Sequence, residues 1–230
     1  MILQTKDLTK KYSDFLALAA VSMNREPEDI YSLVGRNGKG KTSLLRCIRG
    51  LQKPSSGSFE IMGEKKALNQ EGKKIGFMIS SAFFPYQKAR ENLNYLAKLK
   101  SIGDSKEREK GLSYVELQNE IKMHKSFSLE MKQRLGIAGA LLGSPRLVIV
   151  DEPINGFNPQ GIKAIREPIK YIHKKKKTTF LISSHILAEL DLLTCLSRRV
   201  AILAFYEFVV YLLTAVLLAV VAFERKVIGI

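Results

Sequence analysis

The chain has 230 residues and a mass of 25.8 kDa, with 46% apolar and 26% charged residues. This composition indicates one globular domain, or a domain with a small subdomain, and excludes a disordered, collagen-like or disulfide-scaffold protein. Lysine and arginine outnumber the acidic residues by 37 to 22, so the formal net charge is +15. Such an excess favours an anionic partner: a nucleotide, a nucleic acid or a membrane surface. Two cysteines, Cys47 and Cys195, are too few for a disulfide framework and indicate a reduced, cytosolic setting.

Short apolar runs alternate with helical patterns along the chain. Residues 2–8 and 17–23 read as strands of an antiparallel layer, and residues 1–11 lack the continuous apolar core of a secretory signal. Further apolar runs predict the strands of a largely parallel sheet that is covered on both faces; they occupy residues 30–34, 74–79, 147–150 and 178–182. The predicted fold class is therefore α/β.

The middle of the chain has a different pattern. From residue 89 to 142 it is mostly helical, with segments at 89–100, 114–121 and 129–142, and residues 103–105 read as a turn. This predicts a helical insertion, from about residue 85 to 142, between two strands of the core. The run Lys174 to Lys177 is interpreted as a solvated loop between a helix and a strand, with a lipid- or nucleic-acid-binding patch as the alternative.

The carboxy-terminal segment is almost wholly apolar. Residues 208–223 carry no charge, which makes this stretch a borderline transmembrane candidate because a spanning helix needs about 20 apolar residues. The chain is thus divided into a domain of residues 1–203 and an apolar tail of residues 204–230. A membrane anchor, a buried helix or strand pair, and the truncated end of a fusion to a permease remain alternatives for the tail. Basic residues on both sides leave its orientation open.

Residues 35–43 (GRNGKGKTS) fit the phosphate-binding pattern G-x-x-x-x-G-K-[ST]. An apolar strand precedes the loop and a helical pattern follows it, as phosphate binding requires. The glycines permit backbone angles that bring several N–H groups around an anion. Lys41 is expected to reach the outer phosphates, and the hydroxyl of Thr42 is a ligand that suits Mg²⁺. The candidate nucleotide-binding residues here are Gly35, Asn37, Gly38, Gly40, Lys41, Thr42 and Ser43.

Two acids close the apolar run 147–150. Asp151 is expected on the same sheet edge as the phosphate loop, because ligands of parallel α/β sheets bind at the carboxyl ends of strands. It is the candidate Mg²⁺ ligand together with Thr42. Glu152 follows directly and is the candidate to orient or deprotonate the attacking water. A pair of helix-capping acids is the alternative.

Five segments in a fixed order resemble the ATP-binding subunit of an ABC transporter. They read ARENL at 89–93, FSL at 127–129, MKQRLGIA at 131–138, DEPING at 151–156 and SSHIL at 183–187, in addition to the phosphate loop. The resemblance covers roughly residues 1–200 and is strongest to the subfamily that exports bacitracin-like and lantibiotic peptides. It implies an ABC-type nucleotide-binding fold with a parallel core, an antiparallel β layer and a helical insertion.

The resemblance also implies residue roles and partners. Tyr12 stands where an aromatic ring stacks on adenine, His185 where a histidine contacts the γ-phosphate, and Ser128 where the partner subunit's ATP site is completed. It further implies ATP and Mg²⁺ as cofactors, a homodimer or heterodimer of ATP-binding subunits, and docking of the insertion on a permease at the cytoplasmic face of the cell membrane. A nucleic-acid partner is not expected, because the chain has room for one cassette only.

The sequence departs from the family pattern in the loops expected to do the chemistry. Glu130 replaces a glycine that faces the partner's γ-phosphate, and Asn158 replaces an aspartate that crosses the dimer. Ser80 or Ser81 replaces a glutamine or glutamate that senses Mg²⁺. Glu28 and Ser32 stand near the first core strand, where a glycine is usual. These departures leave two functions open: an ATPase that powers export of peptide antibiotics or drugs, or a weakly or non-hydrolysing subunit with a scaffolding or regulatory role.

Overall fold

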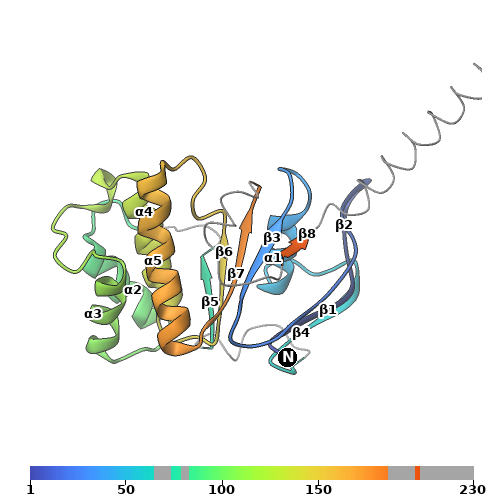
Figure 1. Cartoon of the computed structure of the whole chain (residues 1–230), viewed down its shortest axis with the longest axis horizontal. Helices are drawn as coiled ribbons and strands as arrows, with labels where there is room; N and C mark the ends of the chain where they lie inside the picture. Colours follow the sequence, from blue (N-terminus) through green and yellow to red (C-terminus); the bar gives the residue numbers. More distant parts are fainter. Residues whose placement is uncertain (65–73, 79–82, 186–199, 203–230) are drawn as a thin grey trace, which may run out of the picture.

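The computed structural model describes residues 1–64, 74–78 and 83–185 and the backbone of residues 200–202 (Figure 1). The predicted apolar tail, residues 204–230, and the two serines at 80 and 81 lie outside the described residues. Among the described residues, no helix is long and apolar enough to cross a membrane.

A three-stranded antiparallel sheet forms one layer of the fold. Its strands are β1 (Leu3–Tyr12), β2 (Phe15–Arg25) and β4 (Ser56–Ile61), in the order β2-β1-β4. The first two were predicted at residues 2–8 and 17–23. The sequence analysis missed β4, because its first three residues, Ser-Gly-Ser, have a turn-forming composition and only its last half favours a strand.

The second sheet is parallel, and the carboxyl ends of its strands form the edge at which ligands of such sheets bind. It comprises β3 (Ile30–Val34), β5 (Ile75–Met78), β6 (Leu147–Asp151), β7 (Thr179–Ser184) and β8 (Val200–Ile202), in the order β5-β6-β7-β3-β8. Every pairing between neighbouring strands is parallel. The four strands predicted for this sheet are confirmed, and so is the α/β fold class.

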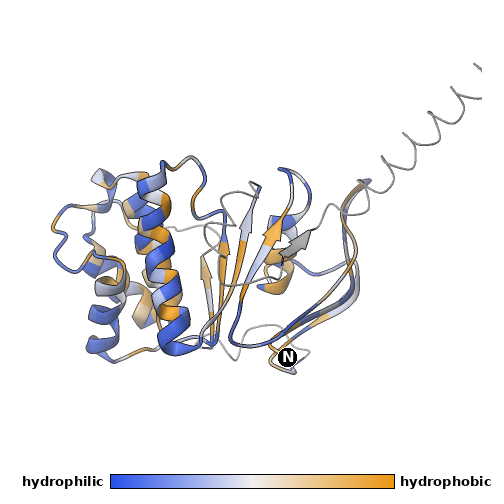
Figure 2. Ribbon diagram, viewed as in Figure 1, coloured by the Kyte–Doolittle hydropathy of each residue, from blue (hydrophilic) through white to orange (hydrophobic). Residues whose placement is uncertain are grey.

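Both faces of the parallel sheet are covered, which explains why its strands read as continuous apolar runs. Successive residues of a strand point to opposite faces, so Val148 and Val150 pack with the helices on one side while Ile149 packs on the other. Helices α4 (Leu129–Leu141) and α5 (Pro159–Lys176) cover the first side, and α1 (Lys41–Ile48) covers the second (Figure 1). In Figure 2, β5 and β6 are orange, whereas α5 is largely blue on its outer surface.

The helical insertion lies between β5 and β6 in chain order, as predicted. It contains α2 (Ala89–Leu99), α3 (Ser105–Tyr114), a short 3₁₀ helix (His124–Ser126) and α4. The prediction that residues 114–121 are helical is wrong, because α3 ends at Tyr114. Glu116 adopts a left-handed φ of 56°, and the N–H of buried Leu117 donates to the carbonyl of Leu112. This backbone arrangement is a common helix terminator.

The lysine run is also placed differently from the prediction. Lys174, Lys175 and Lys176 form the last turn of α5 rather than a loop, and Lys177 caps the helix with a left-handed φ of 53°. Positive side chains are favoured at this position, because the carbonyl end of a helix carries a partial negative charge. The run therefore has a structural explanation without an anionic ligand.

Gly76 in β5 generates a stability prediction, because α4 passes close to it. A Cβ atom at this position would lie 2.0 Å from the carbonyl oxygen of Ala140, which is backbone and cannot rotate away. We expect Gly76→Ala to lower the free energy of unfolding by about 1–3 kcal/mol through overpacking. The matched control is Gly103→Ala, whose Cβ would have no neighbour within 4 Å. Urea unfolding measures both, and equal midpoints for the two variants would contradict the prediction.

Candidate functional site

The carboxyl ends of β3, β6 and β7 bring the predicted phosphate loop and carboxylates to one edge of the parallel sheet. The backbone N–H of Gly35 donates to the carbonyl of Ser184 over 3.3 Å, which joins the start of the loop to the end of β7. The hydroxyl of Thr42 donates to Oδ2 of Asp151 over 2.9 Å, which joins α1 to the end of β6. Residues that lie 109 positions apart in the chain thus meet at one site.

The phosphate loop uses two of its three glycines for left-handed backbone angles. Gly38 has a φ of 82° and Gly40 a φ of 79°, whereas Gly35 is not among the residues with positive φ. Gly40 also packs tightly, since a Cβ there would lie 2.1 Å from the carbonyl oxygen of Ala17 in β2. Asn37 and Gly38 form the exposed tip of the loop. The loop therefore begins α1 with N–H groups available to an anion.

The side chain of Lys41 is buried inside the loop. Only 4% of it is exposed, and its ammonium donates to the carbonyls of Gly35 and Arg36 over 2.5 and 3.2 Å. It also forms an ion pair with Oε1 of Glu152 at 3.3 Å. A buried cation needs such partners to offset its lost hydration. Lys41 is thus already oriented at the centre of the site.

The two adjacent carboxylates have different partners. Asp151 accepts a hydrogen bond from Thr42 on one oxygen and from the hydroxyl of Ser183 on the other. Glu152 turns away with a left-handed φ of 46°. Its Oε2 accepts from Nδ2 of Asn155 over 3.2 Å and lies 3.4 Å from Nδ1 of His185. Glu152 therefore stands between the lysine of the loop and the histidine after β7.

The hydroxyl of Thr42 and the carboxylate of Asp151 are ligands of the type that Mg²⁺ prefers. Their oxygens lie 2.9 Å apart at the mouth of the loop, so both can face one small cation. The chemistry and position of these two residues fit the predicted Mg²⁺ site.

Tyr12, the predicted adenine contact, lies beside the start of α1. Its hydroxyl donates to Oε1 of Gln52 and lies 3.5 Å from Oγ of Ser43, and 37% of the residue is exposed. The ammonium of Lys10 lies 5.0 Å from the centre of its ring. The structure thus places Tyr12 next to the predicted phosphate-binding segment, with part of its surface open to a ligand.

Ser128 is the one predicted site residue that the structure does not bring to the phosphate loop. It precedes α4 in the helical insertion, on the far side of the parallel sheet from α1 (Figure 1). Its hydroxyl accepts a hydrogen bond from the N–H of Met131 and so caps the helix. Within one chain its role is structural, and its predicted part in a partner's ATP site stays a prediction.

Two residues that depart from the family pattern have partners within the chain. One carboxylate oxygen of Glu130 pairs with Nη2 of Arg134 at 3.3 Å, and the other lies against Gly161 near the start of α5. Asn158 caps α5, because its Oδ1 accepts from the N–H of Gly161 over 2.8 Å. Glu130 therefore forms a pair within α4 and lies close to the start of α5, which Asn158 caps.

The sequence analysis gave no role to Ser183 or Asn155, although both stand in motifs that it quoted. Both hydrogen-bond to the acids at the end of β6. For Ser183 the signal was available, since a polar residue at the end of a predicted parallel strand faces the same edge as the acids of its neighbour. The contact of Asn155 depends on the path of a loop, which the sequence pattern does not define.

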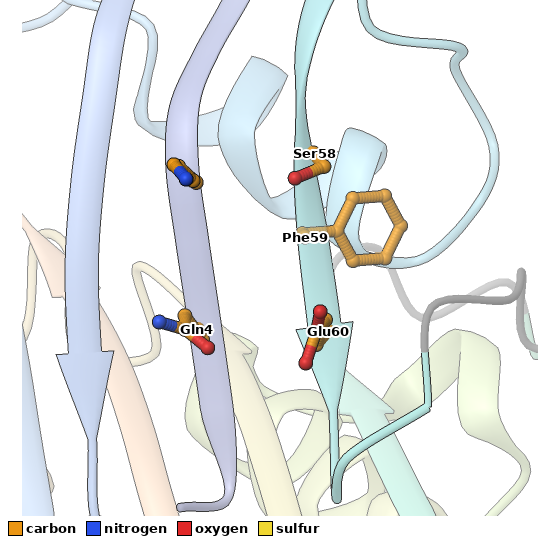
Figure 3. A pocket seen from close by; sticks show the side chains of 5 residues that line it. Gln4, Ser58, Phe59 and Glu60 are labelled. Atoms are coloured by element: carbon orange, nitrogen blue, oxygen red, sulfur yellow. The ribbon is translucent and has the colours of Figure 1, made fainter.

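A separate hollow lies on the antiparallel sheet. It has a volume of about 290 Å³ and is lined by residues of β1 and β4, with Gln4, Ser58, Phe59 and Glu60 labelled in Figure 3. In the strand register, Gln4 pairs with Glu60 and Lys6 with Ser58. This hollow shares no residue with the site around Lys41.

The site can now be compared with known proteins. Residues 18–155 match the family model described as ABC transporter. The chain belongs to this family. It is 43% identical over 194 residues to the bacitracin transport ATP-binding protein of Bacillus licheniformis, covering 83% of this chain and 63% of that protein. It is 37% identical over 198 residues to a lantibiotic transport ATP-binding protein of Streptococcus pyogenes, covering 83% of this chain and 82% of that protein.

A solved structure supports the same assignment. The cbiO1 protein of Clostridium perfringens, described as part of the ABC transporter complex cbiONQ, superposes with a TM-score of 0.73 at 25% identity. The match covers 87% of this chain and 84% of that one. The expected family and its ABC-type fold are therefore confirmed. The chain spans less than two thirds of the length of the bacitracin protein, so the activity and partners of a whole transporter are taken up as proposals.

The contacts of Glu130 generate a second stability prediction. We expect Glu130→Gln to lower the free energy of unfolding by about 0.3–1 kcal/mol, because the pair with Arg134 and the negative charge in the first turn of α4 are both lost. Glu130→Gly should lose about 1 kcal/mol more, because glycine disfavours the helix. Thermal unfolding of the three proteins measures both steps. A Glu130→Gly variant as stable as wild type would show that the contacts contribute nothing.

Proposed function

We propose that this chain binds and hydrolyses ATP to power the export of peptide antibiotics or drugs through a separate permease. The observation that carries the proposal is the joining of Lys41, Thr42, Asp151 and Glu152 at one sheet edge. Each of these residues has the chemistry that phosphoryl transfer requires at its position. The bacitracin and lantibiotic transport relatives support the export of peptides.

The residues of the loop bind the triphosphate in this proposal. Backbone N–H groups around Gly38 and Gly40 surround the β-phosphate, and Tyr12 stacks on adenine. Lys41 contacts the outer phosphates as a point charge. Thr42 and Asp151 would hold Mg²⁺, which neutralises charge on the phosphate oxygens when it is bound.

Glu152 orients the attacking water and accepts its proton. Its present ion pair with Lys41 supports this step, because a phosphate that takes over the ammonium leaves the Oε1 oxygen of Glu152 available to water. His185 lies 3.4 Å from the other oxygen of Glu152 and contacts the γ-phosphate from there. Asn155 donates to that same oxygen and holds the carboxylate in place.

The proposed partners are a permease and a second ATP-binding subunit, identical or related, at the cytoplasmic face of the cell membrane. Exposed apolar side chains on the helical insertion support permease docking: Tyr86 is 71% exposed and Phe84 43%, and the ring of Phe84 packs edge-on against Tyr95. In the dimer, Ser128 completes the partner's ATP site. A nucleic-acid partner is not part of the proposal.

A second candidate function is a subunit that binds ATP but hydrolyses it weakly or not at all, with a scaffolding or regulatory role. The contacts of Glu130 favour it, since a carboxylate fixed between α4 and the start of α5 replaces an open glycine. Like charges a few ångströms apart repel, so this carboxylate would oppose the approach of a partner's γ-phosphate. Steady-state ATP hydrolysis by wild type and Glu130→Gly, with and without the permease, decides between the two functions.

Lys41 generates the first functional prediction. We expect Lys41→Ala to weaken ATP binding by at least about tenfold, because the buried cation at the centre of the loop is lost. Isothermal calorimetry measures the dissociation constant. Arg46→Ala, one turn further along α1 with its side chain exposed, is the matched control and should bind ATP as wild type does. Equal affinities for wild type and Lys41→Ala would refute the phosphate-loop assignment.

Glu152 generates the second functional prediction. We expect Glu152→Gln to keep ATP affinity within a few-fold and to lower kcat by about 10²–10⁴-fold, because an amide keeps the shape of the carboxylate but cannot accept a proton. A coupled phosphate-release assay measures turnover, and the calorimetric affinity of the same variant is the internal control. If wild type hydrolyses ATP and Glu152→Gln turns it over at the same rate, the base is another residue.

A further inference from the structure

Ser183 forms hydrogen bonds to both acids at the end of β6. It lies in β7 opposite Asp151 in the parallel register, and its side chain is fully buried. The hydroxyl donates to Oδ1 of Asp151 and accepts from the backbone N–H of Glu152 over 3.0 Å. The same N–H also reaches the carbonyl oxygen of Ser183 over 3.2 Å.

These contacts define the geometry of both carboxylates. Because Ser183 holds Oδ1 of Asp151, the Oδ2 oxygen is the one that meets Thr42. Because Ser183 also holds the N–H of Glu152, it supports the left-handed φ of 46° that sends this side chain toward Lys41. A non-glycine residue rarely adopts that conformation unless neighbouring contacts impose it.

We propose that Ser183 is a positioning residue: it sets the oxygen that Asp151 presents to Mg²⁺ and the backbone turn that aims Glu152. The inference rests on the proposed ATPase function. The buried hydroxyl donates its proton to Asp151 and accepts a hydrogen bond from the backbone N–H of Glu152. Ser183 therefore acts through the two acids rather than by touching the nucleotide.

The predicted effect of removing the hydroxyl depends on Mg²⁺. Outer partners that orient metal-binding carboxylates typically contribute 10–100-fold to metal affinity or activity. We therefore expect Ser183→Ala to weaken binding of ATP by about 10–100-fold in the presence of Mg²⁺ and to lower kcat by a similar factor. Binding of ATP in EDTA should change less than about twofold, because Lys41 is held by the carbonyls of Gly35 and Arg36 and by Glu152 rather than by Ser183.

Two further variants separate positioning from packing. Ser183→Thr keeps the hydroxyl and should restore Mg²⁺-dependent affinity to within a few-fold of wild type. Ser32→Ala is the matched control: Ser32 is a fully buried serine on the neighbouring strand β3, and its hydroxyl has no hydrogen-bond partner in the described structure. It should leave affinity and kcat unchanged. The melting temperature of each variant shows whether it is folded.

The experiment is calorimetric titration of ATP into wild type and the three variants, with Mg²⁺ and with EDTA, followed by steady-state kinetics. Wild-type affinity and turnover in Ser183→Ala would overturn the inference while leaving the ATPase proposal intact. An equal loss of affinity in Mg²⁺ and in EDTA would also overturn it, because the role would then be structural. A wild type that does not bind ATP would overturn the proposed function, and the inference with it. If Ser183→Thr has a lower melting temperature than Ser183→Ala, its added methyl group disturbs the strand. The affinity of Ser183→Ala for ATP with Mg²⁺ and with EDTA then decides whether the role is positioning or structural.

Discussion

The buried ammonium of Lys41 is the interaction on which the site depends. Because it is almost fully buried, protein oxygens must replace its hydration. Two loop carbonyls and the carboxylate of Glu152 supply them. The ion pair links α1, on one face of the parallel sheet, to the end of β6. The hydrogen bond from Thr42 to Asp151 makes the same link, one residue later in α1 and one residue earlier at the end of β6. The loop and the acids are therefore fixed relative to each other before any ligand binds.

The strands provide the frame for these contacts. The register places Asp151 beside Ser183, and Val34, the last residue of β3, pairs with Ser184 just before the loop begins. The ends of three parallel strands thus bring the loop, the acid pair and His185 to one edge of the sheet. The apolar residues on both faces of the sheet hold this frame, because sliding a strand by one residue would move every side chain to the opposite face and disrupt the packing on both.

Much of this could be predicted from the sequence, and the reasons for the failures are physical. The strands of the parallel sheet were found because burial on both faces produces unbroken apolar runs, and the site was found because its motifs end those strands. The helix predicted at 114–121 failed because a left-handed residue, Glu116, ends α3, and sequence periodicity carries no signal for that angle. The partners of Glu152, including Asn155 and His185, depend on loop paths that only the folded chain defines.

Three of the departures from the family pattern are accommodated inside this chain. Glu130 pairs with Arg134, Asn158 caps α5, and Glu28, in a left-handed conformation that suits glycine better, pairs with Lys177 at 3.2 Å. Each replacement thus gains a partner that offsets part of its cost to the fold. The fold can therefore keep its core and phosphate loop intact while residues at the starts of α4 and α5 change. The carboxylate of Glu130, which is one-third exposed and pairs with Arg134, thus satisfies the fold at a position where the family pattern has a glycine.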